Sequence, residues 1–297
     1  MKQRWVLNLI MLALVAGLVA FLYLRPEANT ETKQYELSQL KLADFSQIKV
    51  EFPARAPTTF EKVDGLWRMT APYKARADQI SVSRILAIIA AKSKDKLPTT
   101  DLAKYGLDNP QVRLKLTNAG GEQVFVFGTF NPVTEEQYVA YQDAVYLLPG
   151  SYSEAAATQP MEMIDKAPLA PSEAKQISGF SFSKLEQWEE LGGLDVQLEN
   201  GQWKVSLAKA KPTQNELNEW LDNLWVHAAA SSVELYKPDR KTAYPSFEVI
   251  LRDGKKVHFD KIQEAPELYL ARPDEGIVYR FPNDVGFSML NPPLNLK

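Results

Sequence analysis

Hydrophobic and polar residues alternate through much of the chain after residue 44, which is typical of strands with one buried face. Asp64-Gly65 and Asn118 to Gly121 interrupt the alternation with residues that favour tight turns. The pattern therefore predicts antiparallel hairpins in the first half of the chain. The predicted strands there are residues 47–52, 58–63, 66–69, 112–117, 124–127, 137–141 and 144–148.

Two segments have helical periodicity instead, with apolar residues on one face. Asp78 is the predicted N-cap of the first helix. Thr213 and Glu216 form a capping box before the second. The expected buried stripes are Val82, Ile85, Leu86, Ile89 and Ala90 in the first helix, and Leu217, Trp220, Leu221, Leu224 and Trp225 in the second.

The order of elements recurs in the second half of the chain. Asn200-Gly201 marks a hairpin there, and Trp203 takes the place that Trp67 has in the first half. The predicted strands are residues 194–199, 202–207, 247–251, 257–259, 268–271 and 277–281. The expected fold is α+β: an N-terminal transmembrane helix, then two tandem repeats, each with a β-hairpin, an amphipathic helix and an antiparallel β-meander.

These patterns also predict the domain boundaries. Proline-rich and polar stretches separate the expected units. The predicted units are a cytoplasmic tip and anchor (1–25), a tether (26–43), a first repeat (44–149), a linker (150–172), a second repeat (173–290) and an irregular tail (291–297).

The N-terminal segment from Trp5 to Leu24 is almost continuously apolar, and its length is sufficient to span a bilayer as a helix. Lys2 and Arg4 precede it, which favours a cytoplasmic N-terminus and a body on the outer side of the membrane. A cleaved signal peptide is the alternative, but the apolar run is longer than such peptides have and no A-x-A site follows it. An uncleaved single-pass anchor is the favoured interpretation.

Composition and motifs argue against catalysis. The chain of 297 residues has no cysteine, a formal net charge of -3 and no long basic run, so disulfides, thiolate chemistry and nucleic-acid binding are not expected. It lacks the usual nucleotide-binding, serine-hydrolase and zinc-peptidase motifs. His227 and His258 have no ligand spacing between them. We therefore expect no catalytic residues, no metal site and no cofactor.

The stretch from Lys104 to Pro132 contains the most distinctive motif, Tyr-Gly-Leu-Asp-Asn-Pro, followed by two strands and a second Asn-Pro. Each motif residue has a turn-forming explanation, and the favoured interpretation is structural. The alternative is a recognition loop held by rigid strands. The candidate binding surface is Tyr105, Gly106, Leu107, Asp108, Asn109, Pro110, Asn131, Pro132 and Tyr138.

These residues, together with Gly128 and Val139, resemble the bacterial family called domain of unknown function 4340. The similarity is clearest from Trp67 to Leu148 and extends as a fainter copy from Leu169 to Phe281. The resemblance implies a single-pass protein of the bacterial cytoplasmic (inner) membrane whose body lies in the periplasm or outside. It also implies association with ABC-type transport systems, including ones linked to gliding motility, and supplies no catalytic residues.

The function expected from the sequence is a non-catalytic, membrane-anchored accessory or scaffold subunit of an envelope transport or assembly complex. Its partners would be the membrane, through Trp5 to Leu24, and other envelope proteins, with an ABC-type transporter among them. A periplasmic ligand-binding module for peptide or glycan is the alternative. An envelope hydrolase is the least favoured, and would require a nucleophile beside His258 and Asp260.

Overall fold

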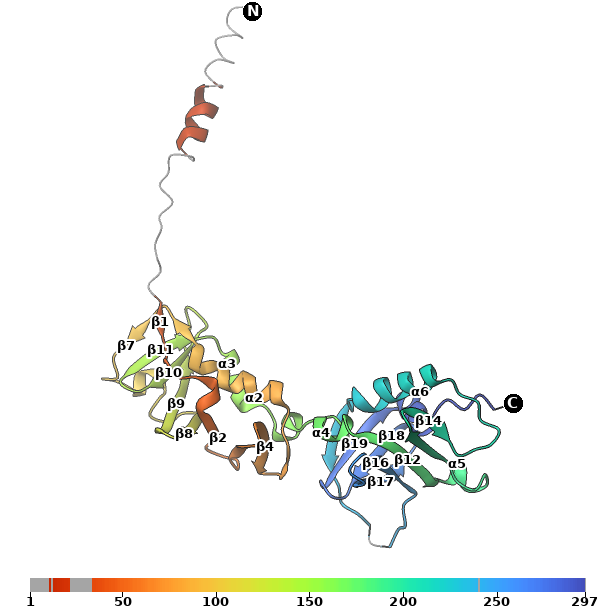
Figure 1. Ribbon diagram of the computed structural model, residues 1–297. Coiled ribbons are helices and arrows are strands. Elements are labelled where there is room, and N and C mark those ends of the chain that lie inside the picture. The colour runs from red at the N-terminus through yellow and green to blue at the C-terminus, as the bar shows by residue number, and fades with distance from the viewer. Residues whose placement is uncertain (1–10, 12, 22–33, 240, 297) are drawn as a thin grey trace, which may run out of the picture.

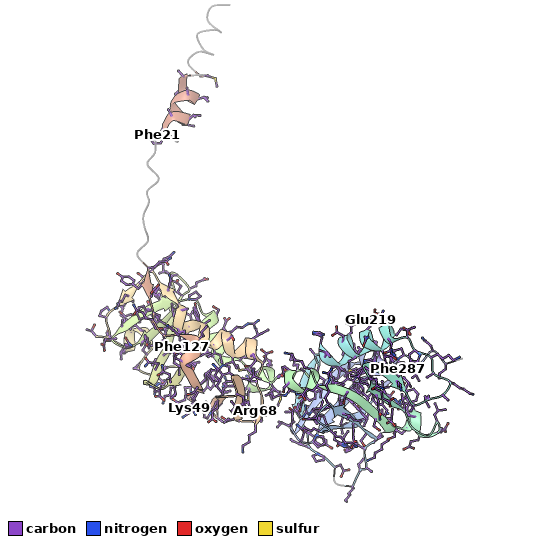
Figure 2. All side chains as sticks on the ribbon, viewed as in Figure 1. Phe21, Lys49, Arg68, Phe127, Glu219 and Phe287 are labelled. Carbon is purple, nitrogen blue, oxygen red and sulfur yellow. The ribbon has the colours of Figure 1, made fainter. Side chains whose placement is uncertain are left out.

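The computed structural model describes residues 11, 13–21, 34–239 and 241–296. These residues form a mixed α+β structure with two lobes, each built on one antiparallel sheet and joined by a narrow connection (Figure 1). Helices α2 and α3 cover the first sheet, and α6 lies over the second. Large apolar side chains such as Phe127 lie inside the lobes, whereas Lys49 and Arg68 lie at the surface (Figure 2).

The first lobe contains a nine-stranded sheet in the order β5-β4-β3-β2-β8-β9-β10-β11-β7, and β1 pairs separately with β6. Its elements are β1 (Tyr35–Glu36), η1 (Leu42–Asp44), β2 (Phe45–Glu51), β3 (Thr58–Val63), β4 (Leu66–Ala71), β5 (Ala75–Arg76), α2 (Gln79–Leu86), η2 (Ala87–Ala90), β6 (Lys92–Ser93), β7 (Lys96–Leu97), η3 (Ala103–Tyr105), β8 (Val112–Asn118), β9 (Gly121–Phe130), β10 (Gln137–Tyr141) and β11 (Ala144–Leu148).

The second lobe contains an eight-stranded sheet in the order β14-β13-β12-β16-β17-β18-β19-β15. The connection consists of α3 (Ser151–Ala157), η4 (Pro160–Met163) and α4 (Pro171–Ala174). The second lobe has β12 (Ile177–Lys184), α5 (Glu186–Glu189), β13 (Asp195–Glu199), β14 (Gln202–Val205), α6 (Gln214–Leu221), the π-helical turn η5 (Asp222–Val226), β15 (Ser232–Leu235), β16 (Ser246–Leu251), β17 (Lys256–Gln263), β18 (Glu267–Arg272), β19 (Ile277–Pro282) and α7 (Asn283–Leu290).

Turn and cap chemistry explains where several elements begin and end. Asp64 and Gly65 both have positive φ values, as the predicted hairpin turn requires. Asp78 caps α2 by accepting a hydrogen bond from the Ser81 amide at 2.7 Å. The predicted capping box of Thr213 is also present at the start of α6. These local predictions are confirmed.

Several predictions differ from the structure. Ala90 is exposed and Ile88 is buried instead, because α2 gives way to the 3₁₀ segment η2, whose three-residue turn rotates the buried face. Strand β12 was not predicted, although it lies between β13 and β16 inside the second sheet. Residues of the predicted tether also join the first lobe, since β1 pairs with β6 and Leu37 is buried.

The predicted anchor from Trp5 to Leu24 lies partly outside the described residues. Met11 and residues 13–21 are helical, and their side chains are exposed. In the part of the chain that the structure describes, no helix has both the length and the apolar character needed to cross a membrane.

The connection between the lobes contacts Arg76, an arginine of the first lobe that is only 8% exposed. Its guanidinium binds Asp165 of the connection and donates at 2.5 Å to the carbonyl of Ala167. It also reaches the second lobe, where Nε donates to Glu275 Oε1 at 2.8 Å and Nη2 to the Tyr279 hydroxyl at 3.0 Å. One buried cation thus joins both lobes and the connection.

Arg272, at the end of β18 in the second lobe, forms a second set of contacts with the connection. Its Nη1 donates to Glu173 Oε2 at 2.8 Å and to the carbonyl of Pro168 at 3.0 Å, and its Nη2 donates to Asp274 Oδ2 at 2.7 Å. Burial by itself would raise the pKa of Glu173. The hydrogen bonds and charge of Arg272 outweigh burial and lower the pKa to about 2.

Replacing Arg76 with alanine should destabilise the protein strongly, because Glu275 and Asp165 would lose their shared buried cation. Breaking a buried ion pair from one side costs about 3–5 kcal/mol. Urea unfolding measures this loss. Arg68→Ala is the matched control, since Arg68 is exposed on the adjacent strand β4, and surface changes of this kind stay within about 0.5 kcal/mol. Equal effects of the two substitutions would contradict the structural role of Arg76.

Glu173 should make stability depend on acid pH. Its pKa is lowered in the folded protein, so its contribution is complete above the unfolded pKa near 4.5 and is lost as pH falls toward about 2. The free-energy difference between wild type and Glu173→Gln should therefore shrink across this interval, from a maximum of about 3 kcal/mol. Urea titrations at several pH values test this, with Glu162→Gln, at an exposed position of the same connection, as control. A difference that is independent of pH would refute it.

Candidate functional site

The Tyr-Gly-Leu-Asp-Asn-Pro motif forms the entry to β8. Segment η3 ends at Tyr105, and Gly106 follows with a φ of 65°. The Gly106 amide donates to the Ala103 carbonyl at 3.0 Å, and the Leu107 amide donates to the Leu102 carbonyl at 2.9 Å. The glycine therefore reverses the chain, as the turn interpretation of the motif requires.

Tyr105 and Leu107 serve packing. Both are buried in a small cluster with Val145, on which Tyr138 also packs. The rings of Tyr105 and Tyr138 lie 4.7 Å apart between centroids. These two tyrosines and Leu107 are therefore part of the core beside β10 and β11.

Position 128 requires glycine because the same loop approaches β9 closely there. A Cβ atom at this position would lie 2.1 Å from the carbonyl oxygen of Tyr105. That carbonyl also accepts a hydrogen bond from Thr129 Oγ1 at 3.1 Å. The loop thus lies directly on the strand, and only a residue without a side chain fits beneath it.

The second Asn-Pro, Asn131-Pro132, forms the turn between β9 and β10. Asn131 Oδ1 accepts from the Val133 amide at 2.9 Å, and the Asn131 carbonyl accepts from the Glu135 amide at 2.9 Å. The structure does not bring this turn into the cavity that the first Asn-Pro lines.

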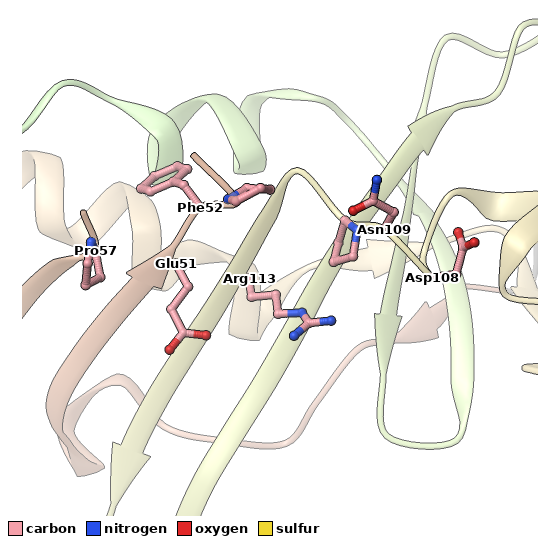
Figure 3. Close-up of a pocket in the computed structure, with 8 residues that line it drawn as sticks. Glu51, Phe52, Pro57, Asp108, Asn109 and Arg113 are labelled. Atoms are coloured by element: carbon pink, nitrogen blue, oxygen red, sulfur yellow. The ribbon is translucent and has the colours of Figure 1, made fainter. Parts of the chain in front are cut away.

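The motif residues Asp108, Asn109 and Pro110 line an open groove of about 430 Å³ (Figure 3). The other walls come from the end of β2 and the residues after it, and from β8. They are Glu51, Phe52, Pro53, Pro57 and Arg113. Glu51 and Arg113 are opposite each other in the antiparallel register of β2 and β8. The groove therefore lies where the motif loop meets the neighbouring end of β2.

Two charged side chains of the groove have no partner among the described residues. Arg113 and Asp108 are exposed and form no ion pair or hydrogen bond through their side chains there. Glu51, by contrast, contacts Lys49 at 2.8 Å and Lys115 at 3.3 Å. The hydrogen bond from Lys49, helped by Lys115, lowers the pKa of Glu51 in spite of partial burial. The groove thus combines a carboxylate that is paired with two lysines, and an arginine and an aspartate that are available to a ligand.

The aromatic wall of the groove is also held in place. The guanidinium of Arg55 lies 3.5 Å from the centroid of the Phe52 ring. Arg55 Nη2 also donates to the carbonyl of Ala157 at 2.9 Å. Arg55 therefore links the groove to the C-terminal end of α3.

Sequence reasoning identified the loop residues Asp108 to Pro110 and missed the rest of the groove. Arg113 alternates with buried residues on β8, which shows that it faces away from the core. Its proximity to Glu51 depends on the pairing of β2 with β8, which are far apart in sequence. No local pattern indicates that pairing.

The two histidines lie elsewhere. His227 is 71% exposed and contacts Asp222 at 3.3 Å. His258 Nε2 lies 2.9 Å from Asp260 Oδ1, and Asp260 Oδ2 accepts from the Tyr236 hydroxyl at 2.6 Å. Burial and this hydrogen bond raise the pKa of Tyr236, so its hydroxyl remains a proton donor rather than a nucleophile. Among the described residues, no three His, Cys, Asp or Glu side chains are placed to hold a metal ion.

These observations define a two-lobed α+β protein whose motif loop packs on a sheet and lines a groove at the ends of the central strands β2 and β8. The family model described as domain of unknown function (DUF4340) matches residues 67–246, which is more than half of the chain. The chain belongs to this family, as the resemblance indicated. No curated protein and no solved structure matches it.

Replacing Gly128 with alanine should displace the motif loop, since the new methyl group would overlap the Tyr105 carbonyl. Overpacking of this kind costs about 1–3 kcal/mol. Urea unfolding gives the stability, and the NMR signals of Tyr105 and Tyr138 report the loop. Gly120→Ala is the control, because its Cβ would meet only the flexible Asn118 side chain, at 3.3 Å. An unchanged stability and unchanged tyrosine signals in Gly128→Ala would refute the packing argument.

Proposed function

We propose that this protein is a non-catalytic accessory or scaffold subunit of a transport or assembly complex in the bacterial cell envelope. The observation that carries the proposal is the coupling of the two lobes by Arg76, which contacts Asp165 in the connection and Glu275 in the second lobe. A scaffold needs binding surfaces at a fixed separation, and buried ionic contacts on both sides of a connection supply that rigidity.

The proposed architecture is a membrane anchor followed by two tandem repeats. The sheet orders support the repeats: β4-β3-β2-β8-β9-β10-β11-β7 in the first lobe corresponds element by element to β14-β13-β12-β16-β17-β18-β19-β15 in the second. The capped helices also correspond in the order of elements along the chain: α2 lies between β4 and β7, and α6 lies between β14 and β15. Each repeat in this proposal begins with the strand that lies in the middle of its sheet.

The proposed location is the cytoplasmic membrane, with a single span from Trp5 to Leu24, the N-terminus in the cytoplasm and the body on the outer side. Its support is the apolar sequence and the basic residues Lys2 and Arg4 before it. The proposed partners are other envelope proteins, and an ABC-type transporter follows from the family resemblance. Nucleic acid is not among the proposed partners, because the net charge is -3.

A ligand-binding module for peptide or glycan is the second candidate, and the groove favours it. Arg113 and Asp108 offer one positive and one negative group without internal partners, beside the Phe52 ring. An extended peptide has carbonyl, amide and charged groups that match such a surface. The hydrolase alternative has less support, because the group on Asp260 opposite His258 is the protonated Tyr236 hydroxyl.

Site-specific photo-crosslinking in native membranes tests the scaffold proposal. A photoreactive phenylalanine analogue at Asp108 of the full chain should capture a specific envelope protein, identified by mass spectrometry, because this side chain is exposed at the groove. Adding Arg113→Ala should reduce the capture several-fold. The same analogue at Asp143, at the exposed tip of the β10–β11 hairpin, is the control.

Equal products from Asp108 and Asp143 would refute the groove as a docking surface. Recovery of the monomer alone at both positions, in membranes where known complexes are captured, would refute the scaffold role. Capture of a small peptide or glycan at Asp108 in place of a protein would favour the second candidate.

A further inference from the structure

In each lobe a glutamine side chain binds the main chain of a tryptophan in the first hairpin. In the first lobe, Gln79 Oε1 accepts from the Trp67 amide at 2.9 Å, and Nε2 donates to the Trp67 carbonyl at 2.9 Å. In the second lobe, Gln214 binds the Trp203 amide and carbonyl in the same way, at 2.7 Å each. Each glutamine is the first residue of its helix, α2 or α6. The same two bonds therefore join helix and hairpin in both lobes.

The main chain of Trp203 points away from the neighbouring strand β13. The Ser206 amide donates to the Asp195 carbonyl at 2.9 Å, just beyond the paired residues Val196 and Val205. Residues of an antiparallel pair flanked in this way have N–H and C=O groups that point outward, and the pattern recurs at every second residue. Trp203 and Val205 are therefore the outward-facing positions of β14, and a further strand would bond to them.

Only an amide can form both bonds to the tryptophan. One atom must accept from the N–H group and the other must donate to the carbonyl, so a carboxylate fails at the second bond and a hydrocarbon at both. Gln79 Nε2 also donates to the Ala77 carbonyl at 2.7 Å, which fixes the orientation of its amide group. The glutamine side chain thus takes the place of a peptide group in a neighbouring strand.

The two sheets differ in what lies beyond the tryptophan strand. In the first lobe, β5 continues the sheet past β4, and its Ala75 pairs with Met69. In the second lobe, β14 is the terminal strand of the sheet, and no described strand lies beyond it. Gln79 is half-buried, whereas Gln214 is exposed. Gln214 is therefore the group that occupies the outer edge of β14 at Trp203.

The edge of β14 is complementary to a second copy of itself. Exposed edges with free N–H and C=O groups pair readily with other strands. Two antiparallel copies of β14 would match Trp203 of each with Val205 of the other, and would place the two Lys204 side chains opposite each other. Lys204 is exposed and binds Glu199 at 2.6 Å. Like charges directly opposite destabilise such a pair, so Lys204 opposes the pairing that the main chain permits.

We propose that Gln214 prevents β14 from pairing with a second copy of this chain. Its amide occupies the donor and the acceptor of Trp203, so an incoming strand can bond only to Val205. The hydrogen bonds of one residue do not offset the entropy lost when a strand is ordered. Gln79 forms the same bonds without this consequence, because β5 already covers β4. The proposal is independent of the scaffold function, since it concerns only the second sheet.

Disulfide trapping tests the proposal in the full chain, in detergent solution. The chain has no cysteine, so one introduced cysteine reports contact between copies. Lys204→Cys removes the opposing charge and, in the paired dimer, places two sulfurs on Cα atoms about 4.5 Å apart, which a disulfide can bridge. With Gln214 present, mild oxidation should give little dimer on a non-reducing gel. Adding Gln214→Ala should raise the dimer yield at least tenfold.

Arg68→Cys with Gln79→Ala is the matched control. Arg68 is exposed and follows Trp67 as Lys204 follows Trp203, but it is already paired with β5. Its dimer yield should stay at the level of Arg68→Cys alone. A comparable rise in this control, or no rise when Gln214→Ala is added to Lys204→Cys, would overturn the proposal.

Amide hydrogen exchange separates an exposed edge from an unfolded lobe. In Gln214→Ala, the Trp203 amide should exchange at least tenfold faster, while the amides of the interior strand β16 keep their protection. If β16 also loses protection, Gln214→Leu decides the question, because it removes the hydrogen-bonding groups and keeps most of the side-chain volume. Unchanged exchange at Trp203 in the folded variant would show that Gln214 does not close this edge.

Discussion

The buried guanidinium of Arg76 is the contact on which the relation between the two lobes depends. A cation that is almost fully desolvated requires carboxylates and carbonyls on several sides, and those groups come from the connection and from the second lobe. Arg272 repeats this arrangement with Glu173, Asp274 and the carbonyl of Pro168. The connection is thereby held between two arginines, and its prolines lie within an ordered structure. Residues that appear as a linker in the sequence are therefore a structural element.

The strands and capped helices were predictable because each is specified locally. Alternation defines β10 and β11, a positive-φ turn defines the β3–β4 hairpin, and Asp78 and Thr213 mark the helix starts. Strand β12 was missed because its sequence, Ile-Ser-Gly-Phe-Ser-Phe-Ser-Lys, includes a glycine that lowers strand propensity. Tertiary packing outweighs that propensity, since Phe180 and Phe182 stack in the core with Trp220 and Trp225 nearby. The contacts of Arg76 likewise depend on partners distant in sequence.

The candidate site likewise has a part that the sequence predicts and a part that depends on strand pairing. The motif was recognisable, and the turn chemistry of Gly106 and the extended entry at Pro110 follow from residue type alone. That Tyr105 and Tyr138 would form a core, while Asp108 and Asn109 would face a groove, depends on which strands lie next to each other. The unsatisfied oxygen of Gln137 is still less accessible to sequence reasoning, because it results from one hydrogen bond to Gly128. A glutamine at the start of a strand gives no sequence signal of an unsatisfied acceptor.

The contacts of Arg76 also have a consequence for the order in which the chain assembles during synthesis. Asp165 and the Ala167 carbonyl are available soon after the first sheet is complete, but Glu275 and Tyr279 are made 199 and 203 residues after Arg76. Until those two residues are made, this arginine can bind only its ligands in the connection. Glu275 and Tyr279 then supply the remaining ligands of the guanidinium. The full set of contacts at the junction therefore requires the second lobe as well as the connection.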